Sequence, residues 1–262
     1  MGMVLGDGSL SVRQRLKDGK YPYTAAELTL KHSIVQREYM DHKAAMLNRM
    51  FGGNATVREF SVTVSGKVHQ QCRLSKSHKY FRALHRVTHP GGTYKITRRL
   101  LDYLTPHGIA VWYMDDGSAR VNRSEKGWVT SCSTDISTCC SYDEAVEVQL
   151  YFQRAHDIAV KVFRAKPGKD YYSIRMNTAE SQKFARLISE WVIPHMRYKL
   201  AHVADLNVHE CRTLAKTCVV CGKLSYNIDR KRGMCGACYA KDRYAARKAG
   251  DDIVRPNGTT TV

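Results

Sequence analysis

Long apolar runs are missing from this sequence, and their absence excludes one class of protein. No stretch of about 18 or more apolar residues occurs in the chain, so no segment is expected to cross a membrane as a helix. Residues 1–8 also lack the basic flank and the apolar core of a secretory signal. We therefore expect an intracellular protein, cytoplasmic or organellar, that is not secreted.

Acidic residues are scarce as well. The 262-residue chain has 24 Asp and Glu against 42 Lys and Arg, which gives a formal net charge of +18. A surface this basic favours a polyanionic partner, either a nucleic acid or an anionic membrane. Hydrophobic residues make up 43% of the chain, which is ordinary for a globular protein. One large domain or two modest ones are therefore expected.

The cysteines are too few for a disulfide scaffold, since only nine occur in a chain of this length. Four of them form two Cys-x-x-Cys pairs with 13 residues between the pairs, and these are Cys218, Cys221, Cys235 and Cys238. Four thiolates at this spacing can bind one tetrahedral Zn²⁺. We predict a structural zinc module at residues 211–245; unligated cysteines and a redox dithiol are the alternatives.

Basic residues accompany the cysteine pairs and make the module a candidate DNA-binding element. The candidates are Arg230, Lys231, Arg232 and Arg243. Such an element would lengthen a recognised DNA site. The alternative is a zinc-stabilised cap whose basic face is only solvated. The last segment, residues 246–262, is expected to be a flexible tail.

An internal repeat is the most informative feature of the sequence. The segment Val4–Ser9 returns as Trp112–Ser118, and in both copies an apolar run ends in Asp-Gly-Ser. Asp7 and Asp116 therefore occupy matching places, 109 residues apart. A single Asp-Gly pair is usually only a turn, whereas two copies with similar surroundings indicate a duplicated unit.

The patterns after the two copies predict two similar halves, residues 1–105 and 106–206. In the first half a polar loop follows the motif, and then come a strand (26–31), a helix (36–50), two strands (55–65 and 68–74) and a helix (77–88). The second half repeats this order with a strand (127–133), a helix (142–156), two strands (159–164 and 171–176) and a helix (181–192).

The position of the two Asp residues predicts a metal site. Each would lie at the C-terminal end of an apolar helix, where the helix dipole disfavours a negative charge by about 0.3–1 kcal/mol. If the two helices pack together, the carboxylates of Asp7 and Asp116 also repel each other. A divalent cation offsets both penalties, and Mg²⁺ prefers oxygen ligands of this kind. We therefore predict that Asp7 and Asp116 bind Mg²⁺.

These motifs resemble degenerate copies of the LAGLIDADG motif of homing endonucleases, in the subgroup with GDGS in the first copy and WxMDDGS in the second. The resemblance covers residues 1–205 and includes Leu30–Ser33 and Pro194–Leu200. It implies an α+β fold of tandem pseudo-symmetric αββαββα repeats with curved antiparallel DNA-binding sheets, to which the zinc module is appended. It also implies a monomer in which the two motif helices form the interface between the halves.

The resemblance further implies an activity. The chain is expected to be a site-specific homing endonuclease, as in intron homing, that makes a Mg²⁺-dependent double-strand break in a long DNA target. Asp7 and Asp116 match the last acidic residue of each motif, so each would help to hydrolyse one strand. Asp115 is a candidate secondary ligand, with a surface or capping role as the alternative.

Two further groups of residues are candidates for contact with DNA. Basic groups near the cut phosphates would stabilise charge; the candidates are Lys31, Arg73, Arg175 and Lys199. Strand alternation directs other side chains outward, toward phosphates or base edges; these are Arg58, Ser61, Thr63, Lys161 and Arg164. The alternative for both groups is a solvated charged surface. The histidines, His32 among them, show no spacing typical of a nuclease, and each is expected to have a structural or surface role.

A second function stays open on the same scaffold. The chain could be a non-cleaving nucleic-acid binder, either an intron RNA maturase or a DNA-binding regulator. Such proteins can lose the acidic pair, whereas both acids are present in this sequence. Their presence favours cleavage.

Overall fold

The computed structural model describes the chain except for residues 18–20, 124, 126–128, 201–215, 226–232 and 249–262. Two compact units are formed. The first unit comprises Met1–Val121 and Cys132–Asp205, and the second comprises Asn122–Ser131 and Leu206–Val262. None of the described helices is both long and apolar enough to cross a membrane.

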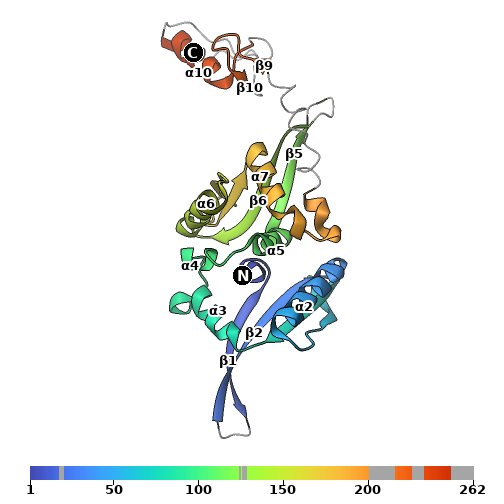
Figure 1. Cartoon of the computed structure of the whole chain (residues 1–262). Helices are drawn as coiled ribbons and strands as arrows, with labels where there is room; N and C mark the ends of the chain where they lie inside the picture. The colour runs from blue at the N-terminus through green and yellow to red at the C-terminus, as the bar shows by residue number, and fades with distance from the viewer. Residues whose placement is uncertain (18–20, 124, 126–128, 201–215, 226–232, 249–262) are drawn as a thin grey trace. The chain divides into compact units, whose positions relative to one another are not determined.

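The first sheet is antiparallel and has the strand order β1-β2-β4-β3. Figure 1 labels its strands β1 and β2. Its strands are β1 (Ser9–Lys17), β2 (Tyr21–Ser33), β3 (Val57–Val64) and β4 (Lys67–Ser77). Its helices are α1 (Gly2–Leu5), α2 (Arg37–Phe51) and α3 (Tyr80–Thr88), with 3₁₀ turns η1 (Ile34–Gln36) and η2 (Pro90–Gly92). The order along the chain is therefore αββαββα.

The second sheet repeats this topology with the strand order β5-β6-β8-β7. Its strands are β5 (Gly117–Arg123), β6 (Val129–Cys140), β7 (Lys161–Arg164) and β8 (Tyr172–Met176). The helices are α5 (Pro106–Asp116), α6 (Tyr142–His156) and α7 (Thr178–Ile188), with α4 (Arg98–Leu101) before them and 3₁₀ turns η3 (Ser189–Trp191) and η4 (Pro194–Lys199) after them. The predicted α+β fold with two antiparallel sheets is confirmed.

Local sequence signals fix where the helices of the second half begin. Thr105 caps α5 by accepting a hydrogen bond from the backbone N–H of Gly108, and Pro106 follows it at the first helical position. Ser141 and Glu144 form a reciprocal capping box at the start of α6. These caps satisfy backbone donors that have no partner inside the helix, and they place α5 and α6 at fixed points along the chain.

Two strands were missed by the residue pattern. The segment after the first Asp-Gly-Ser was expected to be a polar loop, but residues 9–17 form β1, and residues 117–123 form β5 in the same place in the second half. Both strands are rich in polar residues and lie at a sheet edge. In β1 the pairing with β2, from Ser9 opposite Thr29 onward, supplies the hydrogen bonds, so strong apolar alternation is not needed.

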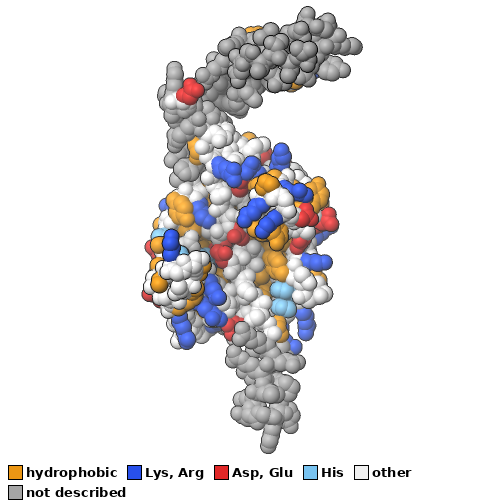
Figure 2. Space-filling model, turned by 180° about the vertical axis from the view of Figure 1, so that it is seen from behind, with side chains coloured by type: hydrophobic (Ala, Val, Ile, Leu, Met, Phe, Trp, Pro, Cys, Tyr) orange, Lys and Arg blue, Asp and Glu red, His pale blue; other side chains and the backbone are white. Residues whose placement is uncertain are grey.

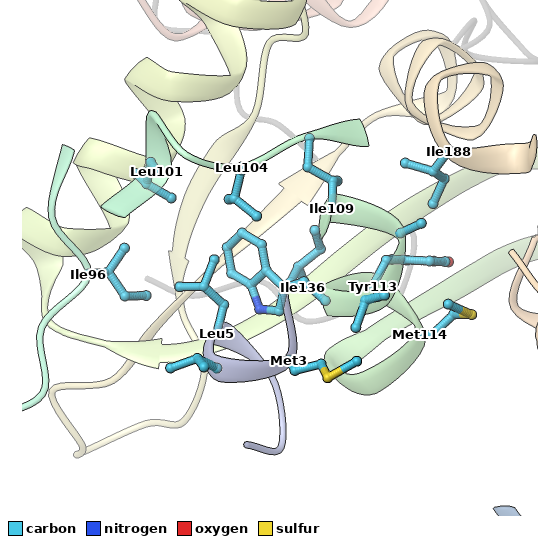
Figure 3. Close-up of a cluster of buried hydrophobic side chains, with 14 of the residues drawn as sticks. Met3, Leu5, Ile96, Leu101, Leu104, Ile109, Tyr113, Met114, Ile136 and Ile188 are labelled. Carbon is cyan, nitrogen blue, oxygen red and sulfur yellow. The ribbon is translucent and has the colours of Figure 1, made fainter. Parts of the chain in front are cut away.

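One hydrophobic core joins the helices and sheets of both halves. The apolar face of α5 is fully covered, and Trp112, Tyr113 and Met114 are each 0% exposed. Met3 and Leu5 from α1 belong to the same cluster (Figure 3). The two motif helices therefore contribute to a shared core, and the residues that follow them are held in fixed positions.

The second unit contains a short hairpin and a helix within its described residues. The hairpin strands are β9 (Lys216–Thr217) and β10 (Leu224–Ser225), and the helix is α10 (Gly236–Lys248). The helix extends past residue 245 into the segment that we predicted to be a tail, while residues 249–262 lie outside the described part of the chain.

Candidate active site

The two motif helices approach each other through glycines. A Cβ atom built on Gly2 of α1 would lie only 2.0 Å from the carbonyl oxygen of Gly108 on α5. Any side chain at this position would clash with α5, so only glycine lets the two helices pack this closely. The close packing brings the C-terminal ends of both helices together, and Asp7 and Asp116 are found there.

The carboxylates of Asp7 and Asp116 interact electrostatically. The pKa of Asp116 is raised to about 7, first because the group is largely buried and then because of the nearby charges of Asp7 and Asp115. The Asp7 side chain is 42% exposed. A bound cation would relieve the repulsion, and a proton on Asp116 would compete with that cation as the pH falls below about 7.

Asp115 ties the two motifs together. Its Oδ1 accepts a hydrogen bond from Nζ of Lys43 at 2.6 Å, and both side chains are 0% exposed. Its Oδ2 lies 3.3 Å from the backbone N–H of Asp7, which donates to it. The carboxylate fits here because Gly6 has no side chain: a Cβ atom at Gly6 would lie only 2.4 Å from the same oxygen. Asp115 therefore positions the backbone beside Asp7.

His32 and Lys43 complete this buried cluster. Nε2 of His32 lies 2.9 Å from Nζ of Lys43 and 3.6 Å from Oδ2 of Asp7, while its Nδ1 lies 2.6 Å from Oε1 of Gln36. The pKa of His32 is lowered by burial and then by the charge of Lys43. The ring is therefore neutral, with Nδ1 donating to Gln36 and Nε2 accepting from Lys43. Lys43 has no special spacing relative to either motif, so the sequence did not reveal it.

The donor set decides which residues fit a divalent cation. Asp7, His32 and Asp115 offer ligand atoms within 4.8 Å of one another, but Lys43 already donates to His32 and Asp115. An ammonium group and a metal ion cannot share the same lone pairs. Asp7 and Asp116 offer carboxylate oxygens, the donors that suit Mg²⁺, and their assignment as its ligands stays a prediction.

Lys199 is the predicted basic residue that lies beside the acids. It is on η4, and its Nζ donates to the carbonyl oxygens of Met114 at 2.6 Å and Asp115 at 3.1 Å. Burial lowers its pKa, while the charges of Asp115, Asp116 and Asp7 act in the opposite direction. The ammonium group thus satisfies carbonyl groups at the C-terminal end of α5.

Three other predicted support residues lie on the sheets instead. In the first sheet, Arg73 of β4 lies directly opposite Lys31 of β2 on one side and Arg58 of β3 on the other, so the three form one row across the sheet. The corresponding row of the second sheet contains Asp135 of β6, Arg175 of β8 and Lys161 of β7. We call these the first row and the second row. Figure 2 shows one face of the molecule on which Lys and Arg side chains are numerous.

The remaining strand candidates do not share the face of these rows. Ser61 and Thr63 lie three and five residues after Arg58 in β3, so they are on the opposite face of the sheet from Arg58. This is the face of Val57, which pairs with the buried Leu74. Arg164 likewise alternates with Lys161, and its Nη2 lies 3.5 Å from the carboxylate of Asp170. All five strand candidates are exposed, yet only Arg58 and Lys161 lie in the first and second rows.

Residues 1–184 match a family model described as the LAGLIDADG DNA endonuclease family. The chain belongs to this family. The resemblance drawn from the two Asp-Gly motifs is confirmed at this level.

Curated relatives of this LAGLIDADG chain include RecA proteins. It is 29% identical over 215 residues to Protein RecA of Mycobacterium shimoidei and 28% identical over 204 residues to that of Mycobacterium gastri, with 76% of this chain and 45% of the relative covered in both comparisons. It is 19% identical over 207 residues to the cytochrome b mRNA maturase bI2 of Saccharomyces cerevisiae, with 77% and 46% covered. The chain spans less than half the length of these relatives.

A solved structure shares the fold of the LAGLIDADG chain. The homing endonuclease I-WcaI bound to its DNA recognition sequence aligns with a TM-score of 0.58 and 21% sequence identity. The alignment covers 76% of this chain and 82% of that one. The likeness supports the assignment of the two-sheet architecture to the family fold.

The second unit of the LAGLIDADG chain contains the four-cysteine cluster. The sulfur atoms of Cys218, Cys221, Cys235 and Cys238 all lie within 4.8 Å of one another. The backbone N–H of Cys235 donates to Sγ of Cys218 at 3.2 Å, and such bonds lower the pKa of the Cys218 thiol to about 6. Gly222 has a positive φ of 68° and closes the turn after the first pair. Four convergent thiols with a stabilised thiolate fit the chemistry of Zn²⁺.

The basic candidates of this unit are only partly described. Arg243 lies on α10, whereas Arg230, Lys231 and Arg232 lie outside the described residues. Their predicted contact with DNA stays a prediction.

Zinc removal is expected to unfold the four-cysteine cluster. A chelator, or the substitution Cys218→Ser, should abolish most of the zinc content and expose residues 211–245 to limited proteolysis, because metal binding supplies the folding free energy of such small modules. Zinc content and proteolysis are measured together. The matched control is Cys139→Ser, since Cys139 is exposed and lies outside the cluster. An unchanged digestion pattern after complete zinc removal would contradict the assignment.

Proposed function

We propose that this chain is a site-specific homing endonuclease that makes a metal-dependent double-strand break in a long DNA target. The observation that carries the proposal is the arrangement of Asp7 and Asp116 at the ends of two helices that pack through Gly2 and Gly108. A pair of carboxylates in mutual repulsion is suited to hold Mg²⁺. When bound, Mg²⁺ supplies charge neutralisation at the phosphate and an activated water.

The other residues have distinct roles in this proposal. Asp115 and Lys43 hold the backbone at Asp7 in place. Lys199 adds a positive charge near the acids, where negative charge develops on the phosphate during hydrolysis. The other basic residues of the two rows contact the DNA backbone, in keeping with the chain's net charge of +18; these are Lys31, Arg58, Arg73 and Lys161.

The partner and the assembly follow from the same scaffold. I-WcaI, with which the chain shares its fold, is bound to its DNA recognition sequence, which supports double-stranded DNA as the partner. Both acids lie in one chain, so a monomer can cut both strands. The four-cysteine cluster is proposed to bind structural Zn²⁺, and its basic residues to extend the contact with DNA.

The alternative is a nucleic-acid binder without cleavage. The similarity to a yeast mRNA maturase at 19% identity favours it only weakly. Both acidic residues of the site are present and adjacent in space, and a binder has no need of them. Cleavage is therefore the function that we infer.

The direct test uses DNA that spans the insertion site of the chain's own gene, without the insert. With Mg²⁺ the protein is expected to produce two defined ends with 3′ overhangs, which end sequencing locates on both strands. The control is the same reaction with EDTA in place of Mg²⁺. Tight binding without any cut strand, in the presence of Mg²⁺, would favour the non-cleaving alternative.

A further inference from the structure

One arginine on the second sheet is held in a single orientation. Nε and Nη2 of Arg175 donate to the two carboxylate oxygens of Asp135 at 2.6 and 2.7 Å. The guanidinium carbon also lies 4.4 Å from the centroid of the Phe163 ring. The carboxylate fixes one edge of the guanidinium and the ring covers one of its faces, so little rotational freedom remains.

The carboxylate that holds Arg175 is itself fixed. Asp135 is 6% exposed and lies directly opposite Arg175 in the pairing of β6 with β8. Its Oδ2 also lies 3.3 Å from Nε of Arg120 on β5. Both oxygens therefore have partners within the protein, and the arrangement exists before any ligand arrives.

The remaining edge of the guanidinium points to a specific ligand. Two Arg175 nitrogens are used on Asp135, which leaves the N–H groups of Nη1 and one N–H of Nη2 available, and the side chain is 35% exposed. Its neighbours Ile174 and Met176 are buried in the core, so Arg175 lies on the opposite face of the sheet, where it is partly exposed. Two parallel donors on a fixed edge match the O6 and N7 acceptors of guanine in the major groove.

The first sheet lacks this arrangement at the equivalent place. Arg73 is the counterpart of Arg175, but Lys31 stands where the second row has Asp135. Nε of Arg73 donates to Oγ of Ser75 at 3.2 Å, its Nη2 lies 3.6 Å from Oε1 of Glu27, and its side chain is 45% exposed, so no carboxylate holds it through two hydrogen bonds. Arg73 can therefore adapt its position to a phosphate. The fixed geometry of Arg175 is not needed for a phosphate contact, and it suits a base edge instead.

We infer that Arg175 reads one guanine base in the half of the DNA site that lies against the second sheet, and that Asp135 and Phe163 are its positioning residues. The inference rests on the proposed function and deepens it, because it names a residue that determines sequence specificity. It predicts that the two halves of the chain recognise DNA differently at this position.

The test is selection from a pool of randomised duplexes long enough to hold both half-sites. The full chain and the variants Arg175→Lys, Asp135→Asn and Phe163→Leu are each used to recover bound DNA, which is sequenced. The matched control is Arg73→Lys, the same substitution at the equivalent position of the first half. Thermal unfolding of each variant, followed by circular dichroism, identifies any variant that is not folded.

The native chain is expected to select a site with guanine at one position of that half. Arg175→Lys should lower the preference for this guanine by roughly 5- to 150-fold, and Asp135→Asn and Phe163→Leu should lower it less, at the same position only. Arg73→Lys should lower affinity evenly over all sequences, as for a phosphate contact, and should not change the preference for this guanine. An unchanged preference in folded Arg175→Lys, or an even loss over all sequences as for a phosphate contact, would overturn the inference. If the native chain selects no site at all, the proposed function itself fails.

Discussion

Replacement of Asp7 or Asp116 with Asn is expected to lower double-strand cleavage by roughly a thousandfold, because a metal ion that stabilises charge contributes several kcal/mol to such a reaction. Asn keeps the shape of the side chain but removes the charge that holds the cation. Binding to DNA should persist, since the basic residues of the first and second rows are unchanged. Cleavage is measured on both strands of one labelled duplex, and binding by titration of the same duplex.

The control for this pair of variants is Asp102→Asn. Asp102 is an acidic residue of the first compact unit, but its side chain is 57% exposed and its partner is Arg98 at 3.9 Å. This variant should cut like the native chain. Retention of full double-strand cleavage by both Asp7→Asn and Asp116→Asn would refute the metal assignment and, with it, the proposed catalytic site.

Replacement of Lys43 with Met is expected to lower the free energy of unfolding by about 3–5 kcal/mol, because it leaves the buried carboxylate of Asp115 without its cation. Lys43 and Asp115 are linked by a 2.6 Å hydrogen bond, and both side chains are 0% exposed. The free energy of unfolding is measured by denaturant titration in the absence of divalent cations.

Two further variants make this test specific to the pair. The double variant Lys43→Met with Asp115→Asn should recover part of the loss, because no uncompensated charge remains, and the interaction energy is obtained from the double-mutant cycle. The control is Lys166→Met on an exposed turn, for which a change within about 0.5 kcal/mol is expected. A similarly small change for Lys43→Met would show that the pair is not important for stability.

The sequence predicted the fold well where apolar periodicity and a repeated motif were strong. The duplicated Asp-Gly-Ser segment and the patterns after it indicated two similar halves, and the matching αββαββα order agrees with that expectation. The residue pattern missed β1 and β5, because edge strands rich in polar residues receive their stability from pairing with a neighbour rather than from burial of their own side chains. Only the family resemblance implied a strand in these places.

The site was less accessible to sequence reasoning. Asp7 and Asp116 were found because each follows a recognisable motif, whereas Lys43 and its contacts with Asp115 and His32 depend on how α2, β2 and α5 pack. Long-range contacts of this kind leave no local pattern. Arg175 was expected near the cut phosphates, but its partner Asp135 lies 40 residues away in the chain and becomes adjacent only through the pairing of β6 with β8.

The pairing of Gly6 with Asp115 has a consequence for the evolution of this chain. The carboxylate of Asp115 occupies the space that opens because Gly6 has no side chain. Two identical copies of the second motif would direct two such carboxylates at each other, and two copies of the first would leave Lys43 without its partner. The two motifs are therefore not interchangeable, because each supplies the side chain or the space that the other lacks.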